Sequence, residues 1–184
     1  MKKLCGIDEA GRGPVAGPLV MAGVVFKTYI DGLNDSKKLT EKKREELYNT
    51  IVENSIYHIV SFEAATIDEL GISACLTSGL KEIMQTIPAS EYIFDGNSTF
   101  GISNLNCQIK ADATIPEVSA ASILAKVTRD RYMVGLSKKY PQYGFEKHKG
   151  YGTKAHIDAI VKNGLSPVHR RSFKIKSLKQ PTLF

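Results

Sequence analysis

The sequence predicts a mixed α/β domain, and two observations carry that prediction. Apolar, β-prone segments at 3–8 and 18–26 are separated by the Gly/Pro-rich residues 11–17, which is the pattern of two strands joined by a turn. Residues 116–139 begin with a proline and keep small and apolar side chains at helical spacing, which is the pattern of a long helix. Strands that come first, with helices interspersed after them, indicate a mixed sheet flanked by helices.

The remaining elements follow from local signals along the chain. Thr66 and Glu69 have the spacing of a capping box, so a helix is predicted to begin there and to continue towards Thr86. Gly71 is expected to break its first turn. The other predicted elements are a helix at 40–53, strands at 56–64, 92–95 and 107–110, and a helix at 153–163 that ends before Gly164.

The long helix at 116–139 is expected to pack closely on the sheet. Small residues among the apolar ones would allow the two backbones to approach each other. The predicted packing face consists of Val118, Ala121, Leu124 or Ala125, and Thr128, with Ala120 and Ser122 beside it.

Length and composition fit one domain over residues 1–184, with a basic C-terminal part at about 141–176 and an expected flexible tail at about 177–184. Hydrophobic residues make up 42% and charged residues 24% of the chain, close to ordinary globular usage. The longest apolar run, 18–26, is shorter than the roughly 20 residues of a membrane-spanning helix, and the first residues lack a signal-peptide pattern. We expect a cytoplasmic protein, and a monomer by default because no exposed heptad calls for a partner helix.

Cysteines and histidines give little sign of a metal or disulfide framework. Cys5, Cys75 and Cys107 are widely spaced and form no Cys-x-x-Cys or Cys/His pattern, so reduced, buried thiols are expected. The four histidines also lack metal spacing, and His58 lies in a predicted strand, where a structural role is expected.

Basic residues gather in the last third of the chain. From Lys126 onward there are fourteen Lys/Arg and three Asp/Glu, a formal charge of +11, whereas the preceding residues carry −5. This excess fits a phosphate-rich partner. A basic face that merely keeps the protein soluble would give the same charge, so charge alone leaves both interpretations open.

Four carboxylates lie where predicted elements begin or end, which is where functional sites are built. Asp8 and Glu9 close the first strand, Asp95 ends a short strand, and Asp112 lies shortly before the long helix. Three separate segments could therefore converge on one edge of the sheet. Because neighbouring side chains on a strand point to opposite faces, Asp8 and Glu9 can share one site only if the strand ends or bulges between them.

Clustered carboxylates repel one another and destabilise the fold unless a cation compensates them. Hard oxygen ligands select Mg²⁺ or Mn²⁺ over zinc. Two such ions roughly 4 Å apart could activate a water and stabilise the leaving oxygen during attack on a phosphodiester, without a side-chain nucleophile. The alternative is that each acid is an ordinary turn or cap residue, which is the simpler interpretation for any one acid taken alone.

The glycine-rich residues 11–17 do not fit a dinucleotide loop. The third glycine comes one place late and a strand, not a helix, is predicted to follow, so a Rossmann interpretation is rejected. Backbone without Cβ beside the acids could instead approach a ribose hydroxyl. A plain hairpin turn is the alternative.

Three loop segments combine basic, hydroxyl and aromatic side chains in a composition suited to phosphate, sugar or base. Each segment taken alone is also the composition of a solvated surface. The segments are Asp35–Lys38, Lys147–Thr153 and His169–Arg171.

Successive segments of the chain resemble the motifs of bacterial ribonuclease HII, the type 2 RNase H family. They are Gly6–Gly13, Asp35–Leu39, Asp95–Gly96, Lys110–Asp112, Ala120–Asp130, Lys149–Thr153 and His169–Phe173. The segments follow in the family's order over about residues 4–173, and such a string is far more specific than any single motif. One departure is Ala111, where the family commonly has glycine, which leaves the backbone beside Asp112 to be established.

The resemblance implies an RNase H-like fold, a mixed β-sheet flanked by helices with a small helical C-terminal part. It also implies hydrolysis of the RNA strand of RNA–DNA hybrids. Incision is expected on the 5′ side of a ribonucleotide embedded in duplex DNA, leaving a 3′-hydroxyl and a 5′-phosphate. The implied roles are removal of ribonucleotides from DNA and removal of RNA primers.

The resemblance also assigns site residues. Two ions, Mn²⁺ or Mg²⁺, with the second bound together with substrate, would be held by Asp8, Glu9, Asp95 and Asp112. The 2′-hydroxyl would be recognised by Gly11, Arg12 and Gly13, and the adjoining deoxyribose by the ring of Tyr151. The remaining substrate contacts would come from Ser36, Lys37, Lys38, Arg170 and Arg171.

Residues 180–184 look like the short Gln-x-x-Leu-Phe peptides that bacterial proteins insert into the sliding clamp. Gln180, Leu183 and Phe184 would be the anchors, since an extended peptide with two apolar side chains suits a groove. The alternative is a frayed tail whose apolar residues fold back on the domain.

Two other functions remain open from the residues themselves. Another nuclease of the RNase H-like superfamily, for example one acting on branched DNA, would share the clustered acids but need no recognition of a 2′-hydroxyl. A non-catalytic nucleic-acid-binding module would need only the basic C-terminal part, and it would not explain four acids in those places.

Overall fold

A computed structural model describes residues 3–33 and 39–175. Its strands are β1 (Leu4–Ala10), β2 (Leu19–Phe26), β3 (Ser55–Phe62), β4 (Glu91–Asp95) and β5 (Leu105–Gln108). They form one sheet in the order β3-β2-β1-β4-β5. β1 pairs antiparallel with β2 and parallel with β4, β2 pairs antiparallel with β3, and β4 pairs parallel with β5. The predicted mixed sheet is therefore confirmed.

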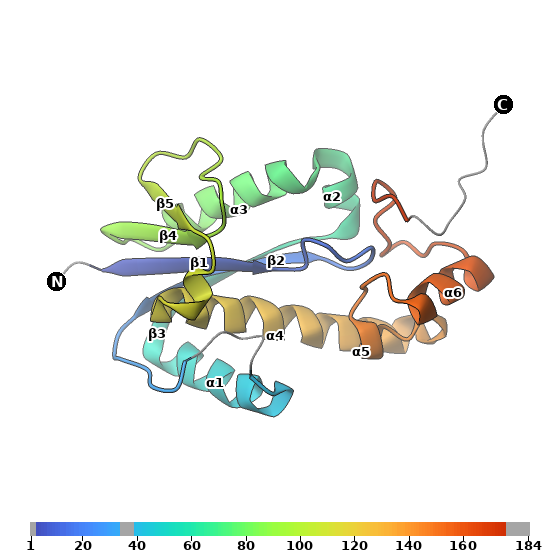
Figure 1. Cartoon of the computed structure of the whole chain (residues 1–184), viewed down its shortest axis with the longest axis horizontal. Coiled ribbons are helices and arrows are strands. Elements are labelled where there is room, and N and C mark those ends of the chain that lie inside the picture. Colours follow the sequence, from blue (N-terminus) through green and yellow to red (C-terminus); the bar gives the residue numbers. More distant parts are fainter. Residues whose placement is uncertain (1–2, 34–38, 176–184) are drawn as a thin grey trace.

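Helices cover both faces of the sheet and continue beyond it. They are α1 (Glu41–Asn54), α2 (Ala64–Leu70), α3 (Ile72–Thr86), α4 (Pro116–Lys139), α5 (Phe145–His148) and α6 (Lys154–Asn163), with short 3-10 helices at Ala111–Ala113 and Pro141–Tyr143. In Figure 1, α2 and α3 lie on one side of the sheet and α1 and α4 on the other. α5 and α6 gather near the C-terminal end of α4.

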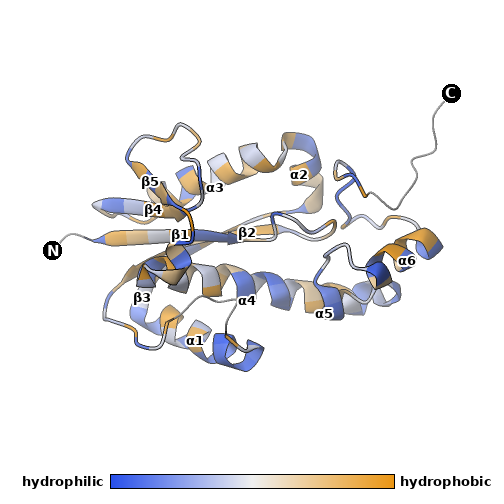
Figure 2. Ribbon diagram, in the orientation of Figure 1, coloured by the Kyte–Doolittle hydropathy of each residue, from blue (hydrophilic) through white to orange (hydrophobic). Residues whose placement is uncertain are grey.

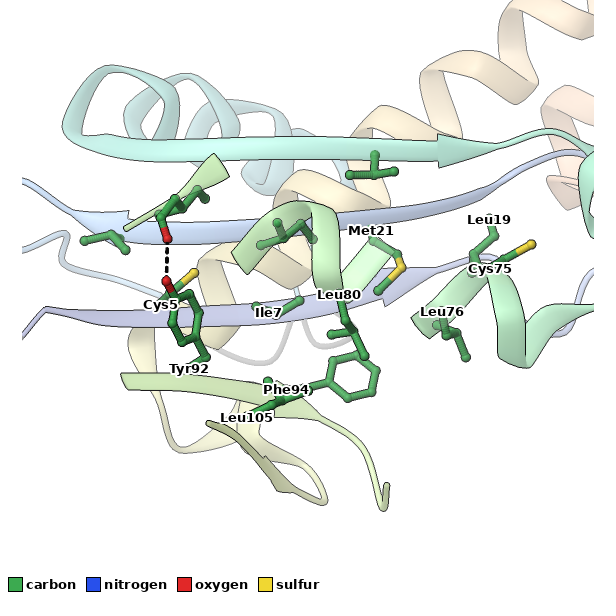
Figure 3. Packing of buried hydrophobic residues seen from close by; sticks show 14 of the residues in the cluster. Cys5, Ile7, Leu19, Met21, Cys75, Leu76, Leu80, Tyr92, Phe94 and Leu105 are labelled. Carbon is green, nitrogen blue, oxygen red and sulfur yellow. Dashed lines mark hydrogen bonds between the residues drawn. The ribbon is translucent and has the colours of Figure 1, made fainter. Parts of the chain in front are cut away.

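The two faces of the sheet bury two apolar clusters because side chains alternate along each strand. On β2, Leu19 and Met21 point towards α3 and pack with residues such as Leu80 (Figure 3). The alternate residues Val20 and Ala22 point the other way and meet α1 and α4. Each fully buried aliphatic side chain contributes on the order of 1.5–3 kcal/mol. Covering both faces explains why β2 is apolar along its whole length.

α4 lies so close to β1 that only glycine fits at the contact. A Cβ added to Gly6 would lie 2.3 Å from the main-chain carbon of Glu117. Every residue from Val118 to Ala125 is buried, because α1 packs against α4 in addition to the sheet. The single packing face predicted for this helix is therefore too narrow. α1 itself is hydrophilic over most of its surface (Figure 2), since it contributes mainly Leu47 and Ile51 to the core.

One helix boundary needs correction. The capping box predicted at Thr66 and Glu69 does not begin the helix, because α2 begins at Ala64 with Glu63 at its N-cap. Gly71 separates α2 from α3 with a φ of +81°, which glycine adopts without a steric penalty. The predicted break at Gly71 is confirmed.

The three cysteines are free thiols, as expected. Cys5 and Cys75 are buried, whereas Cys107 is only partly buried. Among the helices of the described ranges, none is long and apolar enough to cross a membrane.

Candidate active site

The sheet brings three carboxylates together at one edge. β1 and β4 run parallel with Ile7 opposite Phe94, so the next residues, Asp8 and Asp95, reach the same end of the sheet. Asp112 arrives from the 3-10 helix that precedes α4. One carboxylate oxygen from each of these three residues lies within 4.8 Å of the other two. The predicted convergence of three segments is confirmed.

The turn before Asp112 fixes two of the acids relative to each other. Lys110 has a left-handed backbone with a φ of 60°, and its N–H donates to Oδ1 of Asp95 at 2.9 Å. The strand predicted at 107–110 therefore ends earlier, at Gln108. Ala111 is fully buried and is not among the residues with positive φ. The left-handed conformation in this turn belongs to Lys110, so an alanine at position 111 meets no penalty from a positive φ.

Glu9 stands apart from the three-acid group. β1 continues as a paired strand through Ala10, so the end or bulge between Asp8 and Glu9 that a single shared site would require is not present. Glu9 still lines the same cleft, where its carboxylate lies 2.8 Å from the guanidinium of Arg12. Its backbone N–H donates to Oδ1 of Asp8 at 2.7 Å. The structure thus places Glu9 beside the group that Asp8, Asp95 and Asp112 form.

The electrostatics of the site favour a bound cation. Asp8 is 7% exposed and Asp112 is 3% exposed. Burial and the neighbouring charges of Glu9 and Asp95 raise the pKa of Asp8 well above its usual range, although a hydrogen bond with Ser122 opposes that rise. A divalent cation would relieve both the burial and the repulsion. An all-carboxylate donor set of this kind fits Mg²⁺ or Mn²⁺.

Asp8, Glu9 and Asp95 line a cleft of about 670 Å³ that other segments complete. Seven of its lining residues were not predicted to belong to the site. Two of them, Ser122 and Lys126, sit one helical turn apart on α4, a spacing that the sequence shows. Lys126 also forms an ion pair with Asp130 at 2.9 Å. The lining residues are Asp8–Gly13, Arg44, Asp95–Asn97, Ile109, Ser122, Lys126 and Tyr151.

The residues predicted to contact a ribose line this cleft as well. Gly11, Arg12 and Gly13 form one wall, and Tyr151, 45% exposed, belongs to the same cleft. Arg129 and Arg170 lie beneath the glycine-rich loop.

The basic cluster predicted at 169–171 is only partly a surface feature, because Arg170 is buried together with Arg129. Arg170 is only 1% exposed, and so is Arg129. Both donate hydrogen bonds to carbonyl groups of residues 11–18. Arg170 was predicted to contact substrate, and the structure places its side chain behind the loop. Arg171 is exposed, and its backbone N–H donates to Asp68 at 2.8 Å.

Some predicted site residues lie outside the described residues. These are Ser36, Lys37 and Lys38 in one segment, and Gln180, Leu183 and Phe184 in another.

Comparison with known proteins agrees with this geometry. Residues 5–176 match the family model described as Ribonuclease HII. The chain is 64% identical over 183 residues to ribonuclease HII of Sulfurovum sp. (strain NBC37-1), covering 100% of this chain and 97% of that protein. Ribonuclease HII of Archaeoglobus fulgidus, solved in a complex with PCNA, has a TM-score of 0.82 at 29% identity over 98% of both chains. Ribonuclease H2 of Pyrococcus horikoshii OT3 has a TM-score of 0.76 at 29% identity over 94% of both chains.

The fold and the acidic cleft define an endonuclease of the RNase H-like class. Within that class, the chain belongs to the ribonuclease HII family, whose enzymes are metal-dependent and cleave the RNA of RNA–DNA hybrids.

Proposed function

We propose that the protein incises duplex DNA on the 5′ side of an embedded ribonucleotide, leaving a 3′-hydroxyl and a 5′-phosphate. It would act in the same way on the RNA strand of longer hybrids. The observation that carries the proposal is that three carboxylates lie within 4.8 Å of one another, and two of them, Asp8 and Asp95, line a cleft together with a glycine-rich loop and an exposed tyrosine. That arrangement joins a phosphodiester-cleaving centre to groups suited to a sugar.

Asp8, Asp95 and Asp112 would hold one Mg²⁺ or Mn²⁺, and Glu9 would contribute to a second that enters with substrate. When bound, such ions activate a water and stabilise the leaving oxygen. The short contact of Glu9 with Arg12 keeps its carboxylate in the cleft. Ser122 and the N–H of Lys110 orient the carboxylates of Asp8 and Asp95 respectively.

The ring of Tyr151 would pack on the deoxyribose that adjoins the ribonucleotide. Its backbone N–H donates to the carbonyl of His148 at 2.9 Å, and the guanidinium of Arg129 lies 5.8 Å from the ring centre. Arg129 therefore lies near the ring, and Tyr151 itself is partly exposed and lines the cleft. A flat ring on a sugar tolerates a deoxyribose better than a ribose carrying a 2′-hydroxyl, which would favour RNA–DNA junctions.

Phosphates would be bound mainly by basic side chains around the cleft. Arg44, Lys126 and Arg12 line it, and Arg171 lies exposed on the C-terminal part. Ser36, Lys37 and Lys38 would add further contacts. The excess of basic residues after Lys126 suits a duplex that extends beyond the cleft.

The test is cleavage of a labelled duplex with one ribonucleotide, beside all-DNA and all-hybrid duplexes, in Mg²⁺, Mn²⁺ or chelator. Wild type should incise just 5′ of the ribonucleotide with metal only, and Asp95→Asn should lose the activity. Asp158→Asn, at an exposed carboxylate of α6, is the matched control and should cleave like wild type. Incision of an all-DNA branched junction instead would point to a different nuclease. Binding without cleavage under either metal would overturn the proposal.

We further propose that residues 180–184 attach the enzyme to a sliding clamp during ribonucleotide and primer removal in the cytoplasm. The support is the Gln-x-x-Leu-Phe pattern and the PCNA complex of the Archaeoglobus fulgidus relative. Deleting residues 180–184 should abolish capture by purified clamp and leave cleavage of short duplexes unchanged. Equal capture of the truncated and full chains would refute the attachment.

A further inference from the structure

Arg170 is a buried cation whose charge is compensated mainly by backbone carbonyls. Its Nε donates to the carbonyl of Gly17 at 2.9 Å, Nη1 to that of Arg12 at 3.2 Å, and Nη2 to that of Gly11 at 2.6 Å. No ion pair joins Arg170 to a carboxylate within the described ranges. Burial and the neighbouring Arg129 lower its pKa to about 10, so it stays charged at neutral pH. Burying a cation costs more than filling the same space with an apolar side chain, so packing does not explain this residue.

These hydrogen bonds fix the direction of two peptide groups. In a trans peptide the C=O of one residue and the N–H of the next point in opposite directions, and the described chain contains no cis peptide bond. The carbonyls of Gly11 and Arg12 point at the guanidinium. The N–H groups of Arg12 and Gly13 therefore point away from it, and both residues line the cleft. Within residues 3–33 and 39–175, neither N–H donates a hydrogen bond to a backbone carbonyl.

Arg129 binds the C-terminal part of the same loop. Its Nε donates to Pro18 at 2.9 Å and its Nη2 to Ala16 at 3.1 Å, while Nη1 donates to Lys149 at 2.9 Å. A Cβ on Gly11, whose φ is +99°, would lie 2.3 Å from Nε of Arg129. The loop therefore rests directly on this guanidinium, which also connects it to the segment that carries Tyr151.

We propose that Arg170, supported by Arg129, is a positioning residue for ribose recognition, because it turns the N–H groups of Arg12 and Gly13 towards the 2′-hydroxyl of the substrate. This inference rests on the proposed function. The positioning role explains why an arginine occupies position 170. Its planar guanidinium donates to three carbonyls of one loop at once, which the single ammonium of a lysine cannot do in the same geometry. The residue acts through the backbone and touches no reacting atom.

The test compares Arg170→Lys with wild type in three measurements. Cleavage of the single-ribonucleotide duplex should fall in kcat/KM by on the order of 100-fold, the loss expected from misplaced positioning groups. In an Asp95→Asn background, fluorescence anisotropy should show that Arg170→Lys loses the preference for a ribonucleotide-containing duplex over an all-DNA duplex. Affinity for the all-DNA duplex should remain, and so should the rise in Tm on adding Mn²⁺ to the chain with Asp95 intact.

Arg131→Lys is the matched control, because Arg131 lies exposed on the same helix as Arg129 and pairs with Glu45. It should keep the activity and the preference. If Arg170→Lys does not fold, Gly13→Pro removes one N–H donor directly. Gly13→Ala adds a Cβ where no atom lies within 4 Å and keeps the donor, so it should retain more of the ribonucleotide preference than Gly13→Pro.

The outcomes separate this inference from the function it rests on. If wild type does not incise at a ribonucleotide, the proposed function fails first. If wild type incises and a folded Arg170→Lys retains both kcat/KM and the ribonucleotide preference, the positioning role is wrong. Equal loss of affinity for both duplexes would also overturn it, because that pattern indicates a general structural role. If only the two Gly13 variants can be tested, an equal preference for the ribonucleotide-containing duplex in Gly13→Pro and Gly13→Ala would overturn the positioning role.

Discussion

A chain of hydrogen bonds through two buried histidines predicts that acid destabilises the protein. His156 is 0% and His169 is 1% exposed. Nδ1 of His156 lies 2.9 Å from the carbonyl of Tyr151, which only accepts, so Nδ1 carries the proton. Nε2 of His156 therefore accepts from Nε2 of His169 at 3.1 Å. Nδ1 of His169 in turn accepts from the N–H of Ser166 at 3.0 Å. The chain is satisfied only when both rings are neutral.

The size of the effect follows from the pKa shifts. Burial lowers the pKa of both His156 and His169 from an ordinary value of 6.5 to about 4, and the neighbouring His148, stacked on His156 at 4.2 Å, and Arg171 act in the same direction. The unfolded chain therefore binds protons that the folded one does not, so stability is full above pH 6.5 and is lost as the pH falls towards 4. At pH 5 the loss is about 2 kcal/mol per ring. Two rings would lower Tm by roughly 8–16 °C.

The assay is thermal unfolding between pH 7.5 and pH 5 of wild type and of His156→Gln/His169→Gln. The double variant should be less stable at neutral pH but should show a much flatter dependence of Tm on pH. His58→Gln is the control, because His58 lies on β3 beside Glu82 at 2.9 Å and is partly exposed. The same steep slope in wild type and in the double variant would show that these rings do not govern the acid sensitivity.

Three other predictions concern the cleft and its support. Gly6→Ala should destabilise the fold by about 1–3 kcal/mol or more and reduce cleavage, because its Cβ would lie 2.3 Å from the backbone of Glu117. Urea unfolding measures the loss of stability, and an unchanged unfolding midpoint would contradict the prediction. Asp8→Asn should raise the Tm of the metal-free protein by roughly 2–4 °C per kcal/mol of relieved repulsion between the carboxylates. The same variant should lose the stabilisation by Mn²⁺. A lower Tm without metal would count against repulsion between the carboxylates. Tyr151→Ala should reduce junction cleavage more than it reduces the Mn²⁺-induced rise in Tm, and equal losses would argue against a sugar contact.

The fold class, the long helix at 116–139 and the positions of the acids could be predicted from the sequence. These features depend on local physics. Alternation and apolar runs define strands, Pro116 begins a helix, and carboxylates at element ends are visible in a linear sequence. Gly71 was recognised as a break for the same reason, since the φ of +81° that it adopts is a property of glycine itself.

Which acids meet and which arginines are buried depends on contacts between segments that are distant in the sequence. Glu9 differs from Asp8 because β1 continues past both, which pairing with β2 determines. Arg170 belongs beneath the loop because its partners, Gly11, Arg12 and Gly17, lie 153 to 159 residues earlier in the chain. A basic cluster in a sequence predicts solvent-exposed side chains, because charged groups are buried only when other segments supply hydrogen bonds to them. For Arg170 those segments are distant in the sequence, and only the fold brings them together.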